Sequence, residues 1–179
     1  NGISPDVDVP YIVMDPHAKG AQGFSLMSDD SVDAFIAECM EWKRHYGSLE
    51  LVIIDTVSAA AEGLDENSSA EVTKMLTRVN RIRDMTGATV CLVHHMNAAA
   101  TRIRGSSALV ANVANVIEVR PMMTIPKRKD DKPEIIKDTE GRPMRRAILT
   151  KNKNGLNDVK WTFVLQEVAV GIDQDGEQQ

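Results

Sequence analysis

The chain has few aromatic side chains, two cysteines and no long hydrophobic run, and each of these shortages excludes something. Only 4% of its 179 residues are Phe, Trp or Tyr, so a core must consist mainly of Val, Ile, Leu, Met and Ala. Cys39 and Cys91 fall in apolar-periodic stretches without metal-ligand spacing, which predicts buried free thiols in a reducing compartment. No apolar segment approaches membrane-spanning length and no signal peptide is visible, so we expect a cytoplasmic protein without a membrane partner.

The length and the apolar content are those of a single globular domain. Apolar residues make up 42% of the sequence, which is enough for one core. The chain does not begin with Met, and its opening residues, NGISPDVDVP, resemble the interior of a longer sequence. We therefore expect one domain over residues 1–179 that is truncated on its N-terminal side.

Charge is distributed unevenly along the chain. The formal net charge is −5, yet residues 1–100 carry a net of −8, residues 101–160 a net of +7 and residues 161–179 a net of −4. A basic segment inside an acidic protein indicates a local contact with a polyanion, and a solvated, charge-mixed hairpin is the alternative explanation.

An apolar run that ends in an acid is the most informative stretch. Residues 51–54, LVII, are followed by Asp55 and Thr56. An unbroken run of this kind predicts a strand buried on both faces, as in the middle of a parallel sheet. Ligands bind at the carboxyl ends of such strands, where a carboxylate needs a partner for its charge. Asp55 could hold Mg²⁺ beside a nucleotide, or it could simply cap the next segment or start a turn.

Two helices and a second buried strand surround this motif. A helix is predicted from Ser28 to about Tyr46, and a second begins after Ser68, which has capping-box spacing to Glu71, and ends at Gly87. Residues 88–93, ATVCLV, form the next strand. The order strand, helix, strand indicates a βαβ unit and a parallel sheet.

The remaining elements are predicted with simpler signals. Asn154-Gly155 is a strong turn signal between two strands, and several prolines between residues 121 and 144 predict a loop or hairpin insertion. The other predicted elements are strands at Pro10–Met14, Val116–Val119, Arg145–Lys151 and Val159–Val168, and a helix that starts near Gly105–Ser107.

Polar side chains follow both predicted parallel strands. Asp55 ends the first, and His94 and His95 follow the second, so neighbouring strands would bring them to one edge of the sheet. In one interpretation the Asp serves a phosphate-bound metal and a His senses the terminal phosphate. In another they are ligands of a metal-dependent hydrolase, although further ligands at strand ends are lacking. A His pair that only caps a strand is the third possibility.

Two basic motifs follow. Arg102 and Arg104 stand directly before Ser106 and Ser107 at a predicted helix start, where guanidinium groups and exposed N–H groups suit phosphate, although simple helix capping explains the same pattern. Lys151 and Lys153 lie at the end of a strand and the mouth of a turn. A solvated hairpin tip explains them without any function and is the preferred interpretation of this motif by itself.

Taken together, these motifs resemble a known family. LVIIDT, the stretch from DENSSAEV to CLVHH, RGSSALVANVANVIEV, LTKNKNG and EVAVGIDQDGE follow the order seen in RecA-like AAA-domain ATPases related to RepA-type hexameric replicative helicases, over roughly residues 49–176. The resemblance implies an α/β fold: a RecA-like P-loop NTPase sheet with a mostly parallel core and C-terminal antiparallel strands.

The resemblance also implies roles for individual residues. Asp55 occupies the place of the Walker B aspartate that supports Mg²⁺, with Thr56 next to the nucleotide, and His95, with His94 beside it, that of the sensor. Residues 96–104 look like the loop that faces single-stranded DNA, and Arg102, Arg104, Ser106 and Ser107 belong to the DNA-binding signature. Lys151 and Lys153 match the basic pair that reaches a neighbouring subunit's ATP, although Lys is not equivalent to an arginine finger at the second position.

One expected motif is missing. No G-x-x-x-x-G-K-[ST] occurs in the 179 residues, so the fold would lack its N-terminal P-loop strand and this chain alone would be inactive. The parent protein is expected to be an ATP- and Mg²⁺-dependent DNA-translocating ATPase or helicase, a ring, most simply a hexamer, in DNA replication or plasmid or phage maintenance. The alternative is a non-hydrolysing oligomerisation or DNA-binding module on the same scaffold.

Overall fold

The structure is a computed structural model that describes Ile12, Met14 and residues 23–97, 103–126, 128 and 131–166. The chain divides into two compact units, Asn1–Asn112 and Val113–Gln179. In the described residues no helix is long and apolar enough to cross a membrane.

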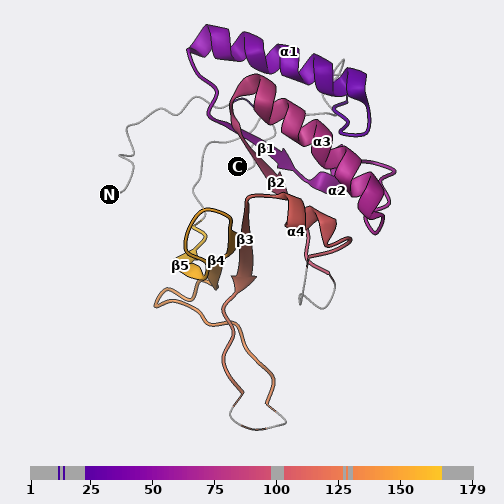
Figure 1. Ribbon diagram of the computed structural model, residues 1–179. Coiled ribbons are helices and arrows are strands. Elements are labelled where there is room, and N and C mark those ends of the chain that lie inside the picture. Colours follow the sequence, from indigo (N-terminus) through magenta and orange to yellow (C-terminus); the bar gives the residue numbers. More distant parts are fainter. Residues whose placement is uncertain are drawn as a thin grey trace, which may run out of the picture. The chain divides into compact units, whose positions relative to one another are not determined.

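The first unit places helices around two parallel strands (Figure 1). The predicted helices at 28–46 and 68–87, the helix after Gly105 and the strands at 51–54 and 88–93 are present, and one short helix at Val57–Ala60 was not predicted. In chain order the elements are α1 (Asp29–Tyr46), β1 (Leu51–Asp55), α2 (Val57–Ala60), α3 (Ser69–Thr86), β2 (Thr89–Val93) and α4 (Ala108–Asn112).

Helix α1 begins and ends where its capping residues predict. The Ser28 side chain accepts a hydrogen bond from the Ser31 N–H at 3.3 Å, and acids occupy the first turn, where they interact favourably with the helix dipole. Gly47 ends the helix in the left-handed conformation, with φ of 87°, and its N–H donates to the Lys43 carbonyl. The predicted bounds of this helix are confirmed.

Helix α3 is capped in the same manner, with one difference from the expected capping box. The Ser68 hydroxyl accepts from the Glu71 N–H at 3.3 Å, as predicted. The Glu71 carboxylate, however, accepts from the N–H of Asp65 at 2.9 Å. The cap therefore also holds the turn that precedes the helix, and Gly87 closes the other end.

Helices α1 and α3 lie side by side on one side of the strands (Figure 1). Lys43 of α1 donates to the Thr86 carbonyl at the end of α3 at 2.6 Å, and Arg78 of α3 binds the Asp29 carboxylate with Nε 2.7 Å from Oδ1. Burial of apolar surface between the helices and strands supplies the main stabilisation. The core includes Val32, Ile36, Cys39, Val52, Ile54, Val57, Val72, Met75, Leu76, Val79 and Ile82.

Strands β1 and β2 pair in parallel, from Leu51 opposite Thr89 to Asp55 opposite Val93. The two carboxyl ends are therefore direct neighbours, as the βαβ pattern predicts. The expectation that the strand is buried on both faces is wrong for the described structure: Leu51 is 50% and Ile53 60% exposed. The reason is that the described helices α1 and α3 cover one face of the pair only. Cys91 is exposed as well, in contrast to the buried Cys39, so the prediction of two buried thiols holds for one of them.

The second unit is an antiparallel sheet of three strands, β3 (Asn115–Pro121), β4 (Met144–Asn152) and β5 (Val159–Val164). Strand β4 lies between β3 and β5. The strand expected at 116–119 is β3, which pairs with β4 and does not extend the parallel pair.

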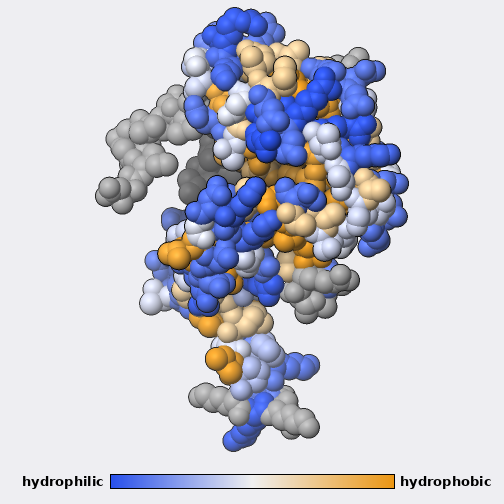
Figure 2. Space-filling view, in the orientation of Figure 1, coloured by the Kyte–Doolittle hydropathy of each residue, from blue (hydrophilic) through white to orange (hydrophobic). Residues whose placement is uncertain are grey.

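One face of the antiparallel sheet is apolar. Ile117 and Val119 of β3 lie opposite Leu149 and Ala147 of β4, and Ala147 in turn lies opposite Trp161 of β5. About half of the Ile117, Val119 and Trp161 surface is exposed. Figure 2 shows hydrophobic side chains scattered among the hydrophilic surface of both units.

Isolated antiparallel bridges join the described residues of the connection between β3 and β4. Met123 bridges Ile135, and Lys137 bridges Pro143. The turn predicted at Asn154-Gly155 connects β4 to β5, where the Asn152 side-chain oxygen accepts from the Asn154 N–H.

Some predicted segments fall largely outside the described residues. Of the strand expected at Pro10–Met14, only Ile12 and Met14 are described, and neither belongs to a strand. The end of the strand expected to reach Val168, and Arg102, lie outside the described residues.

Candidate active site and nucleic-acid interface

The carboxyl end of β1 presents an exposed carboxylate. Asp55 is the last residue of β1, and in the described part of the chain its side chain makes no hydrogen bond or ion pair. Thr56 follows as the N-cap of α2, and its hydroxyl accepts from the Ala59 N–H at 3.3 Å. Asp55 is thus available to a ligand, whereas Thr56 already has a structural role.

The donor set at this strand end fits a magnesium ion that arrives with a nucleotide. Mg²⁺ is usually held by one or two carboxylates together with waters and substrate phosphates. Asp55 provides one unpartnered carboxylate for such an ion. Among the described residues there is no group of three or more His, Cys, Asp or Glu side chains that could hold a metal ion by itself.

The two histidines after β2 have different surroundings. Nε2 of His94 lies 3.0 Å from the Arg104 carbonyl oxygen, and because a carbonyl can only accept, Nε2 carries the proton and donates. In the neutral ring Nδ1 is then an acceptor, and it is buried without a partner among the described residues. His95 is exposed, and its backbone carbonyl accepts from the Arg104 N–H at 3.2 Å.

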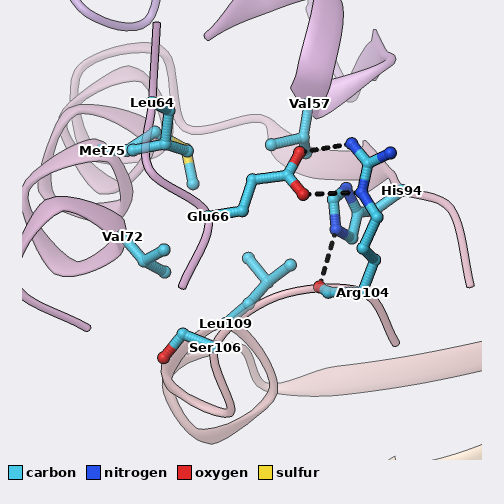
Figure 3. Close-up of a pocket in the computed structure, with 9 residues that line it drawn as sticks. All are labelled: Val57, Leu64, Glu66, Val72, Met75, His94, Arg104, Ser106 and Leu109. Carbon is cyan, nitrogen blue, oxygen red and sulfur yellow. Dashed lines mark hydrogen bonds and ion pairs between the residues drawn. The ribbon is translucent and has the colours of Figure 1, made fainter. Parts of the chain in front are cut away.

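Arg104 is bound to Glu66 by a forked ion pair (Figure 3). Its Nε donates to Oε2 at 2.7 Å, and its Nη2 donates to Oε1 at 2.6 Å. Ser58 joins the pair, since its hydroxyl accepts from Nη2 at 2.8 Å and donates to Glu66 Oε1 at 3.0 Å. The hydrogen bond from Arg104 holds the pKa of the Glu66 carboxyl below its ordinary value, although partial burial opposes the shift.

The residues after Arg104 are fitted closely against the same glutamate. The Ser106 N–H donates to the Glu66 carbonyl at 2.6 Å. Gly105 has φ of +85°, and a Cβ atom there would lie 2.6 Å from the Glu66 carbonyl oxygen, so only glycine fits. Ser106 also accepts from the Ala108 N–H at 3.1 Å and contacts the Ser69 hydroxyl at 2.9 Å. Ser107 is exposed.

These groups border a small cavity of about 10 Å³. A space of this size holds about one water molecule, so it is not a nucleotide pocket. Its lining combines apolar side chains with the polar groups already described: Val57, Leu64, Glu66, Val72, Met75, His94, Arg104, Ser106 and Leu109 (Figure 3).

The basic pair Lys151 and Lys153 lies in the second unit. Lys151 Nζ donates to the Val113 carbonyl at 2.7 Å. The backbone N–H of Lys153 donates to the Ala114 carbonyl at 3.0 Å, and its side chain is exposed. Lys153 is therefore the more accessible cation of the two.

Sequence reasoning missed Glu66 and Ser58. Glu66 was visible only as part of the polar stretch that leads into α3, and its partner Arg104 is 38 residues away in the chain. No helical or strand periodicity links residues at such a separation. A family of aligned sequences would be needed to pair them.

Comparison with known families covers the β1–β2 region. Residues 28–100 match the family model described as an AAA domain, which is under half of the chain and extends from the cap of α1 past the end of β2. No curated protein matches the chain. The part that contains Asp55, Glu66 and the histidine pair is thus similar to an AAA domain, which supports an AAA-type, ATPase-like family and a nucleotide-binding role.

Proposed function

We propose that the chain is part of an ATP-dependent DNA-translocating ATPase or helicase of the RepA type, active in DNA replication or in plasmid or phage maintenance. One observation carries this proposal. The exposed Asp55 carboxylate ends β1, and the parallel neighbour β2 leads directly into His94 and His95, all within the residues similar to an AAA domain. Ligand sites in open α/β sheets lie at this edge.

The proposed nucleotide site uses the two strand ends. Asp55 holds Mg²⁺, directly or through water, and the ion supplies charge stabilisation for the transferred phosphoryl group. Thr56 lies next to the nucleotide, and the exposed His95 ring contacts the terminal phosphate, with His94 fixed beside it. Lys151 and Lys153 reach the ATP of a neighbouring subunit in a ring, most simply a hexamer.

The proposed DNA contact lies between the end of β2 and the start of α4. Arg102, Arg104, Ser106 and Ser107 face single-stranded DNA from this segment. Arg104 keeps the Nη1 edge of its guanidinium for a phosphate, since its Nε and Nη2 atoms are the ones bound to Glu66 and Ser58. The net charge of +7 over residues 101–160 supports a polyanion partner, and such contacts are non-specific and salt-sensitive.

The phosphate-binding loop is assigned to residues outside the 179. The sequence contains no G-x-x-x-x-G-K-[ST] motif, and without it the β- and γ-phosphates have neither a backbone cradle nor a lysine. The proposal therefore expects no hydrolysis by this chain alone.

The test is the rate of ATP hydrolysis, with and without single-stranded DNA, by the protein extended to include such a loop. Asp55→Asn should reduce the DNA-stimulated rate by roughly 100-fold or more, because the metal loses its protein carboxylate. Asp30→Asn is the matched control: Asp30 is also exposed, and it makes no side-chain contact among the described residues. Its rate should equal that of the parent sequence.

A second candidate is a non-hydrolysing oligomerisation or DNA-binding module, and the missing phosphate-binding motif is the observation that favours it. A folded, Mg²⁺-supplied extended protein that binds DNA but never hydrolyses ATP would establish this candidate and reject the ATPase.

A further inference from the structure

We propose that Glu66 and Arg104 form a latch that fixes the segment after β2 to the segment after β1, and that Glu66 is thereby a positioning residue for His94 and His95. The role of the two histidines in phosphate sensing rests on the proposed function. The latch itself is a property of the chain and can be tested without nucleotide.

The main chain of Arg104 is hydrogen-bonded to both residues that directly follow β2. Its carbonyl accepts from the His94 ring, and its N–H donates to the His95 carbonyl. An antiparallel bridge between Met96 and Ile103 continues these contacts. One residue thus contacts both histidines through its main chain, so the position of Arg104 is linked directly to the positions of His94 and His95.

Glu66 holds Arg104 from the other side. The carboxylate binds Nε and Nη2 of the guanidinium, while the Glu66 carbonyl accepts from Ser106, beyond Gly105. Both the side chain and the main chain of Glu66 therefore bind the short run around Gly105. This two-point attachment fixes orientation as well as distance, as is typical of bidentate Arg–carboxylate pairs.

The exposure of the two partners suits a positioning role. The Glu66 side chain is 19% exposed, and that of Arg104 is 48% exposed. Glu66 is therefore the more buried partner of the pair and Arg104 the more exposed one. Glu66 cannot itself contact a polyanion favourably, because both are negative, but it can present the remaining edge of Arg104 in one orientation.

The expected consequence is a coupling between the two strand ends. A ligand that binds the Arg104 guanidinium would shift the Arg104 carbonyl, which is the hydrogen-bond acceptor of the His94 ring. The same ligand would alter the ion pair with Glu66 and, through Ser58, the segment after β1. Coupling between two sites can be transmitted through contiguous hydrogen bonds and ion pairs, and the latch supplies such contacts.

The first test uses the 179-residue chain without nucleotide. Glu66→Gln keeps the shape of the side chain but removes its charge, and we expect amide hydrogen exchange at Arg104 and Ser106 to accelerate by roughly tenfold or more. The ¹⁵N chemical shifts of the His94 ring should change from those of the Nε2–H tautomer to those of a mixture of the two tautomers. Arg104→Lys, which keeps the charge but cannot form the fork, should give the same signature more weakly.

Glu62→Gln is the matched control. Glu62 lies in the same connection between β1 and α3, is exposed, and makes no side-chain contact among the described residues. It should leave both the exchange rates and the His94 shifts unchanged. Equal behaviour of Glu66→Gln and Glu62→Gln would overturn the latch.

The second test separates the latch from the proposed function. In the extended protein, Glu66→Gln should lower DNA-stimulated ATP hydrolysis by roughly tenfold, and Glu66→Asp, which keeps the charge, should restore part of it. If the unsubstituted protein never hydrolyses ATP while the exchange and ring results hold, the latch stands and the ATPase proposal fails. If hydrolysis is normal and Glu66→Gln leaves exchange unchanged, the ATPase stands and the latch fails.

Discussion

Asp55, the last residue of β1, and Glu66, in the connection from β1 to α3, have opposite surroundings. Asp55 is exposed and has no side-chain partner among the described residues, whereas Glu66 is partly buried and bound by Arg104 and Ser58. Sequence alone gives both the same formal charge. In the structure the Glu66 charge is met within the chain, whereas the Asp55 charge has no partner among the described residues.

The difference indicates that two carboxylates near one strand end can have separate roles, one in stabilising the local structure and the other in binding a cation. A carboxylate that is already hydrogen-bonded by a guanidinium contributes to stability and geometry. A carboxylate without a partner adds little to stability but attracts a cation. Substitutions at Glu66 and at Asp55 should therefore have different effects on stability, and this difference tests the two assigned roles directly.

The largest effect is expected at Gly105. Gly105→Ala places a methyl group against the Glu66 carbonyl oxygen and forces a left-handed conformation on alanine, so unfolding free energy should fall by about 2–4 kcal/mol. Urea denaturation followed by circular dichroism measures it. Gly63→Ala is the control, because Gly63 has φ of +83° with nothing within 4 Å of the added Cβ, and about 1–2 kcal/mol is expected. Equal losses at the two positions would show that the close contact with Glu66 is not tight.

A smaller effect is expected when the Glu66 charge is removed. At pH 7, Glu66→Gln should cost about 1 kcal/mol of stability, since charge-assisted hydrogen bonds are lost but Arg104 remains half in solvent. Arg104 lowers the folded-state pKa of Glu66 below its ordinary 4.5. This contribution is therefore complete above the unfolded-state pKa and is lost as the pH falls through the folded-state pKa.

The measurement is the difference in unfolding free energy between the unsubstituted chain and Glu66→Gln as a function of pH. It should be largest near neutral pH and shrink as the pH falls below the ordinary glutamate pKa of 4.5 and through the lowered folded-state pKa. Asp29, whose pKa is lowered by its hydrogen bond with Arg78, is present in both proteins and cancels in the difference. A difference that is independent of pH would argue against a charged pair.

The smallest effect on stability is expected at Asp55. Asp55→Asn removes a charge that no described group meets, so unfolding free energy in metal-free buffer should change by no more than about 0.5 kcal/mol. The same urea titration measures it. A loss as large as that of Glu66→Gln would show that Asp55 has a structural partner, and the comparison between the two carboxylates would fail.

The sequence predicted what local chemistry determines. The bounds of α1 and α3 follow from Ser28, Gly47, Ser68 and Gly87, because a cap acts on the few N–H or carbonyl groups next to it. The parallel pairing of β1 and β2 follows from the length of the connecting helix. The position of Asp55 beside the end of β2 follows from that pairing in turn.

The sequence did not predict what depends on distant partners. An apolar run cannot show how many of its faces are covered, and so Leu51, Ile53 and Cys91 were expected to be buried. The pairing of β3 with β4 in a separate sheet is likewise a long-range choice. Arg104 carried a phosphate-binding signature, but its ion pair with Glu66 joins residues that no local pattern connects.

The antiparallel sheet of the second unit also has a consequence for the order of folding. Residues 153–158 connect β4 to β5, whereas residues 122–143 connect β3 to β4, and this second connection is three to four times as long. Each doubling of loop length adds about 0.6 kcal/mol to the entropic free-energy cost of closing the loop. Closing the longer connection is therefore less favourable by about 1 kcal/mol. Hairpin formation takes microseconds. We therefore expect the β4–β5 hairpin to form first and β3 to pair with it afterwards. Shortening the connection 122–143 should then accelerate folding of the sheet.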